Sequence, residues 1–145
     1  MIINIKSLDL NYFYYNQIIN LYTSFSNFNK ENFTIETLKT LVKKIPNNHH
    51  VLFILNDRDE IIAGITLIIE QKIIHNGGKV GHIEDFVVLE EYRKKGIGAE
   101  LFNYVKNICE INNCYKIILD CDPTLETFYE KKGFTKKGNY MALYF

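Results

Sequence analysis

A strand pattern, a basic segment with two glycines and a helix pattern follow one another in residues 80–113, and this succession constrains the fold strongly. Residues 80–89 are mostly β-branched or apolar, which is typical of a strand. Arg93-Lys94-Lys95-Gly96-Ile97-Gly98 follows, and from Gly98 onward apolar residues recur at helical spacing. The first amides of a helix lack internal partners and carry the positive end of the helix dipole. The succession therefore predicts an anion-binding loop between a strand and a helix.

Three interpretations of this glycine segment compete. A nucleotide-binding P-loop requires Lys and then Ser or Thr after its last glycine, but Ala99 and Glu100 follow Gly98. A dinucleotide fingerprint would use Gly96 and Gly98, but its third glycine position holds Leu101. An ordinary turn with solvated charges stays open if the segment is considered alone.

Length and charge narrow the class of protein. A chain of 145 residues is long enough for one hydrophobic core, so we expect a single domain over residues 1–145. The 17 Lys and Arg residues balance the 17 Asp and Glu residues, which disfavours nucleic acid or an anionic membrane as a partner. The longest apolar stretches, such as residues 61–69, fall short of the roughly 20 residues of a membrane helix.

The start of the chain and its cysteines indicate the compartment. Residues 1–6 lack the succession of a signal peptide, so we expect a cytoplasmic, reducing environment. Cys109, Cys114 and Cys121 lack the paired short spacings of a zinc site, and we expect no metal. Each thiol is interpreted as a core side chain.

Hydrophobic periodicity and turn residues predict an α+β, or mixed α/β, domain. Its central, mostly antiparallel sheet would have helices on both faces. The expected strands are residues 2–5, 51–55, 61–74, 80–89, a buried strand at 115–119, and a closing edge strand at 141–145. The expected helices are residues 8–25, a helix capped by Asn32 or Thr34 that stops before Pro46, residues 98–111, and residues 123–132.

The glycine segment resembles the acetyl-CoA loop of the GCN5-related N-acetyltransferase (GNAT) superfamily, Arg/Gln-x-x-Gly-x-Gly/Ala, at every defined position. Within that superfamily the chain is most similar to the eukaryotic glucosamine 6-phosphate N-acetyltransferases. Three strings carry this resemblance: Gly81-His82-Ile83-Glu84-Asp85, Asn113-Cys114-Tyr115-Lys116-Ile117-Ile118-Leu119-Asp120-Cys121 and Phe128-Tyr129-Glu130-Lys131-Lys132-Gly133-Phe134. The resemblance covers most of the chain from residue 68 onward.

The resemblance implies how acetyl-CoA binds. The loop residues would hold its diphosphate: Arg93, Lys94, Lys95, Gly96, Ile97, Gly98 and Ala99. The backbone of Phe86, Val87 and Val88 would pair with the pantetheine arm like an added strand. Tyr129 would lie beside the sulfur and donate to the departing thiolate, because a phenol with a pKa of about 10 stays protonated at neutral pH.

The resemblance also implies the groups that meet the amine substrate. Glu84, Asp85 and Asp120 would orient the amine and help to move its proton. Lys72-Ile73-Ile74-His75 and Ser24 match stretches that reach the substrate. Tyr144 stands where relatives carry an arginine that engages the substrate phosphate, and a phenol cannot form that charged clamp.

The implied activity is direct transfer of acetyl from acetyl-CoA to D-glucosamine 6-phosphate in a ternary complex, on the route to UDP-N-acetylglucosamine. The resemblance further implies a homodimer with the substrate pocket near the subunit boundary. Two alternatives remain open: the same fold acting on another amine, such as a polyamine or a protein N-terminus, and a non-catalytic acyl-CoA-binding module. The three acidic residues would also suit a cationic acceptor.

Overall fold

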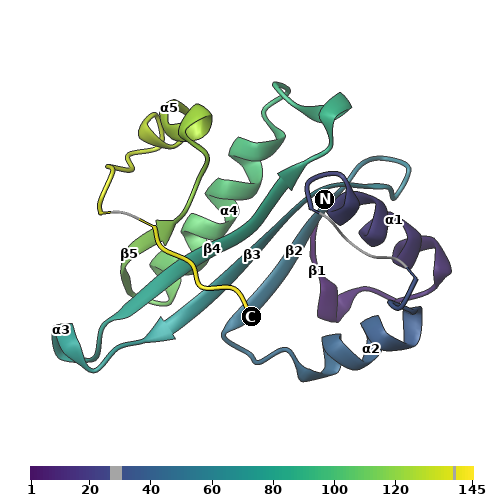
Figure 1. The fold of residues 1–145 in the computed structure, drawn as a ribbon, viewed down its shortest axis with the longest axis horizontal. Helices are drawn as coiled ribbons and strands as arrows, with labels where there is room; N and C mark the ends of the chain where they lie inside the picture. The colour runs from purple at the N-terminus through teal and green to yellow at the C-terminus, as the bar shows by residue number, and fades with distance from the viewer. Residues whose placement is uncertain (27–30, 139) are drawn as a thin grey trace.

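A five-stranded sheet in the order β1-β2-β3-β4-β5 forms the centre of the computed structural model, which describes residues 1–26, 31–138 and 140–145. The first four strands pair antiparallel and β5 pairs parallel to β4 (Figure 1). This arrangement confirms the predicted mixed, mostly antiparallel sheet. The strands are β1 (Ile2–Asn4), β2 (His49–Leu55), β3 (Ile61–Gln71), β4 (Lys79–Val88) and β5 (Cys114–Leu119).

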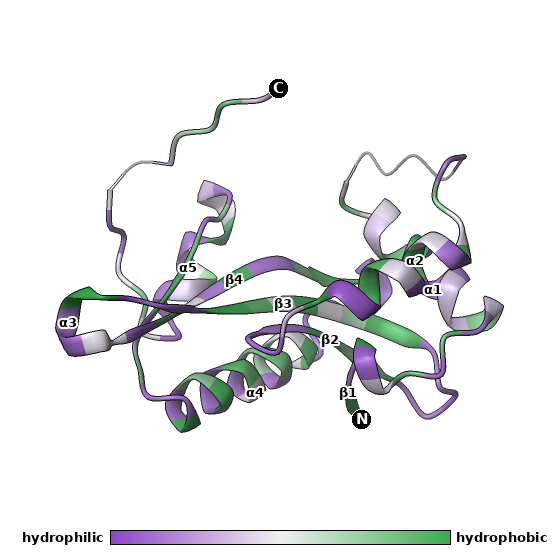
Figure 2. Cartoon of the chain, turned by 90° about the horizontal axis from the view of Figure 1, so that it is seen from below, coloured by the Kyte–Doolittle hydropathy of each residue, from purple (hydrophilic) through white to green (hydrophobic). Residues whose placement is uncertain are grey.

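Helices lie on both faces of the sheet, as predicted. In Figure 2, α4 covers one face, while α1 and α2 cover the other. The helices are α1 (Tyr12–Thr23), α2 (Ile35–Lys44), the short turn α3 (Ile74–Gly77), α4 (Ile97–Ile111) and α5 (Glu126–Glu130). Three 3₁₀ turns, at Ile5–Ser7, Glu90–Tyr92 and Pro123–Leu125, connect them. No helix in the described residues is both long and apolar enough to span a bilayer.

Side-chain caps decide where α1 and α2 begin. The side chain of Asn11 accepts a hydrogen bond from the backbone of Tyr14, so α1 begins at Tyr12 rather than at residue 8 as expected. The side chain of Thr34 accepts from the backbone of Thr37, which makes Thr34, and not Asn32, the cap of α2. Both caps satisfy amides that a helix leaves without internal partners.

Two hydrophobic cores anchor the helices to the sheet. On one face, Leu101, Phe102 and Val105 of α4 pack against a cluster of β2, β3 and β4 residues. On the other face, Ile18 and Leu21 of α1 pack with residues of β2 and α2. Because each of these side chains is almost fully buried, each contributes roughly 1.5–3 kcal/mol of apolar burial. The two cores hold β4 rigidly between helices.

The sheet splits between β4 and β5. The last paired residues are Ile83 and Leu119, so the β5-facing side of residues 84–88 has no strand partner in the described chain. On the other side of β4, the register with β3 shifts between Gly64 and Thr66. This shift is a β-bulge, and Asp85 within it has a left-handed φ of 48°. The split and the bulge together open the sheet at residues 84–88.

Strand β3 ends earlier than expected. It was expected to continue to residue 74, but it stops at Gln71 because β4 must reverse and pair with it from Lys79. The Gln71 side-chain amide closes the turn by donating to the Gly77 carbonyl (2.6 Å). His75 has a left-handed φ of 54° and lies in the short turn at residues 74–77, outside the strand.

Two further expectations for the C-terminal half are wrong. Strand β5 is not buried, because it forms the edge of the sheet and side chains such as Tyr115 and Ile118 are exposed. Residues 141–145 do not form a closing strand. Instead, the C-terminal segment leaves the body of the molecule (Figure 2), and Met141, Leu143 and Tyr144 are highly exposed.

Candidate active site

A cavity of about 220 Å³ occupies the place where β4 and β5 separate. Strand β4 contributes residues before and within the β-bulge. Strand β5 contributes its last residue, and the segment after β5 contributes the next ones. Tyr129 of α5 and Phe25, just after α1, complete its wall. The lining residues are Phe25, Ile83, Glu84, Asp85, Phe86, Leu119, Asp120, Cys121, Asp122, Leu125 and Tyr129. The four predicted catalytic residues therefore lie at one cavity.

The bulge explains why two consecutive acidic residues line the same cavity. Neighbouring residues of a regular strand point to opposite faces of the sheet. Because Asp85 adopts a left-handed conformation in the bulge, both Glu84 and Asp85 line the cavity and both are exposed. Asp120 reaches the same cavity from the residue directly after β5. The cavity therefore presents three carboxylates, which suit a cationic or amine ligand.

Asp122 also lines the cavity, but its carboxylate has local partners. It accepts hydrogen bonds from the backbone amide (2.8 Å) and the hydroxyl (2.7 Å) of Thr124, and these bonds lower the pKa of Asp122. The carboxylate thus caps the 3₁₀ turn at Pro123–Leu125. Asp122 positions the segment that carries Asp120 into the cavity.

Tyr129 is a buried phenol at the cavity wall. Only 8% of the residue is exposed, and its ring packs edge-on against Phe128 (5.0 Å between centroids) and Phe134 (5.7 Å). Burial raises the pKa of Tyr129 to about 12. The phenol therefore keeps its proton across the neutral range and remains a hydrogen-bond donor toward the cavity.

The predicted anion-binding loop, residues 93–99, is called the cradle below and lies where β4 leads into α4. Gly96 is the N-cap of α4 with a left-handed φ of 85°, and no side chain caps the helix there. The first intrahelical bond joins the Glu100 amide to the Gly96 carbonyl (3.0 Å), so the amides of Ile97, Gly98 and Ala99 precede the helical bonding pattern. These three amides and the helix dipole form a site that favours an anion.

The basic residues of the cradle have different partners. The Nε atom of Arg93 donates to the Val88 carbonyl (3.0 Å), which ties the loop to the end of β4. The Lys95 ammonium lies 5.3 Å from the centre of the Tyr92 ring. Lys94 has a left-handed φ of 59° and an exposed side chain. All three residues lie at the surface beside the helix end.

The predicted partner of the pantetheine arm, residues 86–88, is called the pantetheine strip below. It lies along the open edge of β4. Phe86 lines the cavity, whereas the side chain of Val87 is buried on the α1 side of the sheet. Val87 can therefore offer only its backbone to a ligand. Val88 lies next to Gly98 of α4, since a Cβ atom at Gly98 would come within 3.7 Å of its side chain. The strip thus connects the cavity with the cradle.

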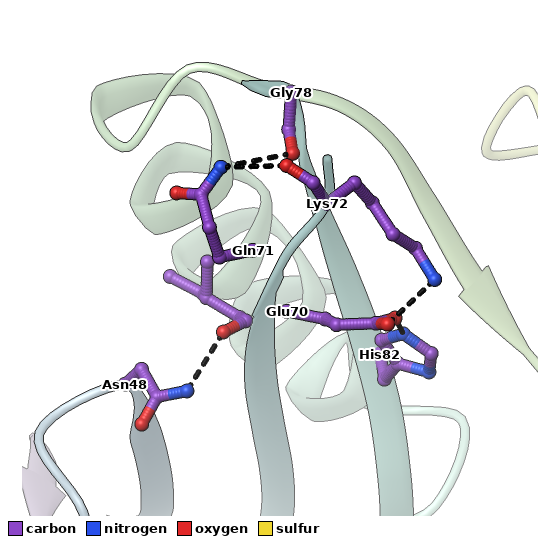
Figure 3. Close-up of polar contacts among 7 residues, drawn as sticks. Asn48, Glu70, Gln71, Lys72, Gly78 and His82 are labelled. Carbon is purple, nitrogen blue, oxygen red and sulfur yellow. Dashed lines mark hydrogen bonds and ion pairs between the residues drawn. The ribbon is translucent and has the colours of Figure 1, made fainter. Parts of the chain in front are cut away.

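The predicted substrate stretch, Lys72, Ile73, Ile74 and His75, does not line the cavity of its own chain. The Lys72 ammonium pairs with Glu70 (2.6 Å), and the second Glu70 oxygen contacts the His82 ring (2.7 Å; Figure 3). These two partners lower the pKa of Glu70. His75 stacks on Tyr115 of β5 (4.4 Å).

Ser24 also lies outside the cavity lining. Its hydroxyl donates to the Leu21 carbonyl (2.6 Å) at the end of α1. The next residue, Phe25, lines the cavity and was missed by the sequence analysis, because an aromatic residue after a helix carries no chemical signal. Cys121 was missed as well, although it directly follows Asp120 in a quoted string.

No cluster of three His, Cys, Asp or Glu side chains suited to a metal ion occurs among residues 1–26, 31–138 and 140–145. The side chains that line the cavity include the carboxylates of Glu84, Asp85 and Asp120 and the phenol of Tyr129.

The sheet opens at an acidic cavity, and beyond the end of β4 lies the N-terminus of α4, which has no side-chain cap. Residues 15–134 match the model of the acetyltransferase (GNAT) family. The chain belongs to this family, whose members take their acetyl group from acetyl-CoA.

Several relatives of this chain carry one and the same name. A glucosamine 6-phosphate N-acetyltransferase of Candida albicans is 35% identical over 131 residues, which cover 90% of this chain and 87% of the relative. A probable glucosamine 6-phosphate N-acetyltransferase 2 of Oryza sativa subsp. japonica is 41% identical over 100 residues, or 66% of this chain and 60% of the relative.

A solved structure extends the similarity to the whole fold. The crystal structure of glucosamine-6-phosphate N-acetyltransferase from Arabidopsis thaliana matches with a TM-score of 0.88 and 30% identity. The match covers 100% of this chain and 97% of that chain.

Proposed function

We propose that this chain is a cytoplasmic glucosamine 6-phosphate N-acetyltransferase. It transfers acetyl from acetyl-CoA directly to the amino group of D-glucosamine 6-phosphate in a ternary complex, on the route to UDP-N-acetylglucosamine. The observation that carries the proposal is the cavity that joins Glu84, Asp85 and Asp120 with Tyr129 at the open edge of β4. The relatives of this name in Candida albicans and Arabidopsis thaliana support the proposal, because this chain matches them over most of their length.

The carboxylates prepare the amine. An alkyl ammonium with a pKa of about 8 is already roughly one-tenth deprotonated at pH 7, so its deprotonation costs only about 1.4 kcal/mol. The oxygens of Glu84, Asp85 and Asp120 accept the N–H groups and lead the proton toward solvent, which reaches these exposed side chains. A backbone amide at the open edge of β4 polarises the acetyl carbonyl.

Tyr129 stabilises the leaving thiolate by a hydrogen bond. Complete proton transfer from a phenol with a pKa of about 12 to a thiolate whose thiol has a pKa near 8.5 would cost roughly 5 kcal/mol. A hydrogen bond to the developing charge requires no such transfer and is stronger than one to a neutral acceptor. Tyr129 is therefore a donor that keeps its own proton.

Acetylation of another amine is the second candidate. The three carboxylates suit a polyamine or a protein N-terminus as well as an amino sugar. The Lys72 ammonium is paired with Glu70, so it is not a free cation for a phosphate within one chain. Tyr144 is exposed outside the cavity and carries an uncharged phenol. If the chain were a non-catalytic acyl-CoA-binding module, the three carboxylates and Tyr129 would have no function in the cavity.

A thiol-release assay with acetyl-CoA separates these functions. The purified chain is expected to release CoA with glucosamine 6-phosphate at a kcat/KM at least tenfold above that with glucosamine, spermidine or an N-terminal peptide. An Asp120→Asn variant is the matched control, because it removes one cavity charge and retains the shape. Release with spermidine alone would favour the second candidate, and no release with any amine would leave only the binding module.

We also propose that the protein is a homodimer. The outer edge of β5 has no strand partner among the described residues. Both β5 and the C-terminal segment carry exposed apolar side chains. Ile73 is 97% exposed at the end of the same sheet. In such a dimer, Lys72, Ile73, Ile74 and His75 would serve the cavity of the other subunit, since they do not line their own.

Shortening the C-terminus tests the dimer. The full chain is expected to sediment at twice its 17.0 kDa mass, whereas a chain ending after Lys137 is expected to be monomeric because it lacks the exposed apolar segment. Analytical ultracentrifugation at several concentrations measures both species. A Tyr104→Phe variant, changed at an exposed position of α4, is expected to remain dimeric. A monomeric full chain would contradict the proposal.

A further inference from the structure

An aromatic ring lies at the acidic cavity without being buried in the core. Phe25, just after the end of α1, lines the cavity and is 45% exposed. The cavity lining contains no Lys, Arg or His among the described residues, and its four carboxylates belong to Glu84, Asp85, Asp120 and Asp122. Phe25 therefore brings an aromatic surface to the same cavity as the groups that receive the amine.

A row of three aromatic rings holds Phe25 in place. Phe53 of β2 is fully buried in the core. The centroid of the Tyr22 ring lies 6.3 Å from that of Phe53, and the Phe25 centroid lies 5.9 Å from that of Tyr22 at an interplanar angle of 51°. Aromatic pairs attract one another at such separations. The three rings thus connect the core to the wall of the cavity.

Hydrogen bonds at the end of α1 fix the backbone beside the ring. The Ser24 hydroxyl donates to the Leu21 carbonyl (2.6 Å), and the Ser26 hydroxyl donates to the Tyr22 carbonyl (2.8 Å). The backbone amides of Phe25 (3.4 Å) and Ser26 (3.1 Å) donate to the same Tyr22 carbonyl. Because the backbone and the ring are both held before a ligand arrives, binding at this wall loses little conformational entropy.

An aromatic ring and carboxylates in one cavity match the two kinds of surface on a pyranose sugar. Such a sugar presents C–H groups on the faces of its ring and hydroxyl or amino groups around its edge. Carboxylates accept hydrogen bonds from the edge groups but have no attraction for the C–H groups. The face of an aromatic ring is electron-rich and apolar, so it packs favourably on C–H groups. A linear amine has no ring face to offer.

We propose that Phe25 is a specificity residue of the amine site, which packs on a face of the sugar ring and thereby favours a cyclic amino sugar over a linear amine. The inference rests on the proposed function and adds a structural basis for its choice of substrate. Acetylation changes the amino group and leaves the sugar ring intact, so the ring contact is equal in the ground state and the transition state. The contact therefore lowers KM for the sugar and leaves kcat nearly unchanged.

Replacing Phe25 with leucine tests this role, because leucine keeps an apolar side chain and removes the ring. The KM of Phe25→Leu for glucosamine 6-phosphate is expected to rise roughly fivefold, as for the loss of one aromatic contact. Its kcat and its KM for acetyl-CoA are expected to stay within about twofold of wild type. Phe25→Tyr keeps the ring and is expected to have a KM for the sugar within about twofold of wild type.

A linear substrate shows whether Phe25 recognises the sugar ring. The probe is 2-aminoethyl phosphate, which carries an amine and a phosphate but no ring. The ratio of kcat/KM for glucosamine 6-phosphate to kcat/KM for this probe is expected to fall roughly fivefold in Phe25→Leu. Phe13→Leu is the matched control, because Phe13 is an exposed aromatic residue of α1 that does not line the acidic cavity. It is expected to show the wild-type ratio.

Calorimetry with N-acetylglucosamine 6-phosphate, the product, measures sugar binding without turnover, and Phe25→Leu is expected to weaken it roughly fivefold. An unchanged KM for the sugar, an unchanged ratio, or an equal rise in the KM for acetyl-CoA would overturn the role of Phe25. If the wild-type chain does not acetylate glucosamine 6-phosphate, the proposed function fails instead. Weaker product binding by Phe25→Leu would then still support the ring contact, and equal binding would overturn it.

Discussion

Replacing Tyr129 with phenylalanine is expected to lower kcat roughly 100-fold and to change the dissociation constant of acetyl-CoA less than about threefold. The phenylalanine ring preserves the packing of this buried residue on Phe128 and Phe134, so the fold is retained. Only the donor to the departing thiolate is lost. Because that charge develops in the transition state, the loss falls on turnover rather than on ground-state binding.

Steady-state kinetics over a pH range measure this effect. The raised pKa of Tyr129, about 12, means that the phenol stays protonated below that pH, so its donor is present throughout a range from pH 6 to about pH 10. The ratio of wild-type to variant kcat is therefore expected to stay constant over this range. Tyr104→Phe on α4 serves as the control and is expected to show wild-type turnover. An unchanged kcat for Tyr129→Phe would show that the thiolate leaves without it.

Replacing Gly98 with leucine is expected to weaken acetyl-CoA binding at least tenfold. A Cβ atom at this position would lie 3.6 Å from Phe86 and 3.7 Å from Phe128 and Val88, which are ordinary contact distances. A methyl group fits there, but a leucine side chain must occupy the space between the cavity and the first amides of α4. Since leucine favours helices, the effect is expected on binding rather than on folding.

Isothermal titration calorimetry with acetyl-CoA measures the loss, with two alanine variants as controls. Gly98→Ala is expected to bind within about threefold of wild type, because its Cβ atom meets no clash. Gly96→Ala has open space around the new methyl group, but the left-handed φ of 85° disfavours alanine and costs roughly 1–2 kcal/mol of stability. If Gly98→Leu bound acetyl-CoA with wild-type affinity, the cradle would not be part of the proposed cofactor site.

Local signals were sufficient to predict most elements. The cap of α2 at Thr34, the end of β2 before the turn at residues 56–59, and the start of α4 within one residue of the predicted Gly98 all depend on residues next to one another in the chain. Capping hydroxyls and glycines with positive φ act on their own turn of backbone. Such elements therefore follow from the sequence without knowledge of their neighbours.

The errors arose where distant parts of the chain decide the structure. Strand β3 stops at Gln71 because β4 returns to pair with it, although isoleucines continue the β-branched pattern to residue 74. The apolar pattern of β5 predicted burial, but its place at the sheet edge leaves several of its side chains exposed. Residues 141–145 have the composition of a strand and no strand beside them in the described chain.

The sequence by itself indicated the order of the main strands and helices up to α5, the glycine loop before α4, and the acidic and phenolic residues of the cavity, because these depend on short-range chemistry and spacing. Only the tertiary structure decided that Glu84 and Asp85 face one cavity together. The physical reason is the β-bulge opposite Thr66. Its left-handed turn depends on pairing between strands, which alternation along one strand does not contain.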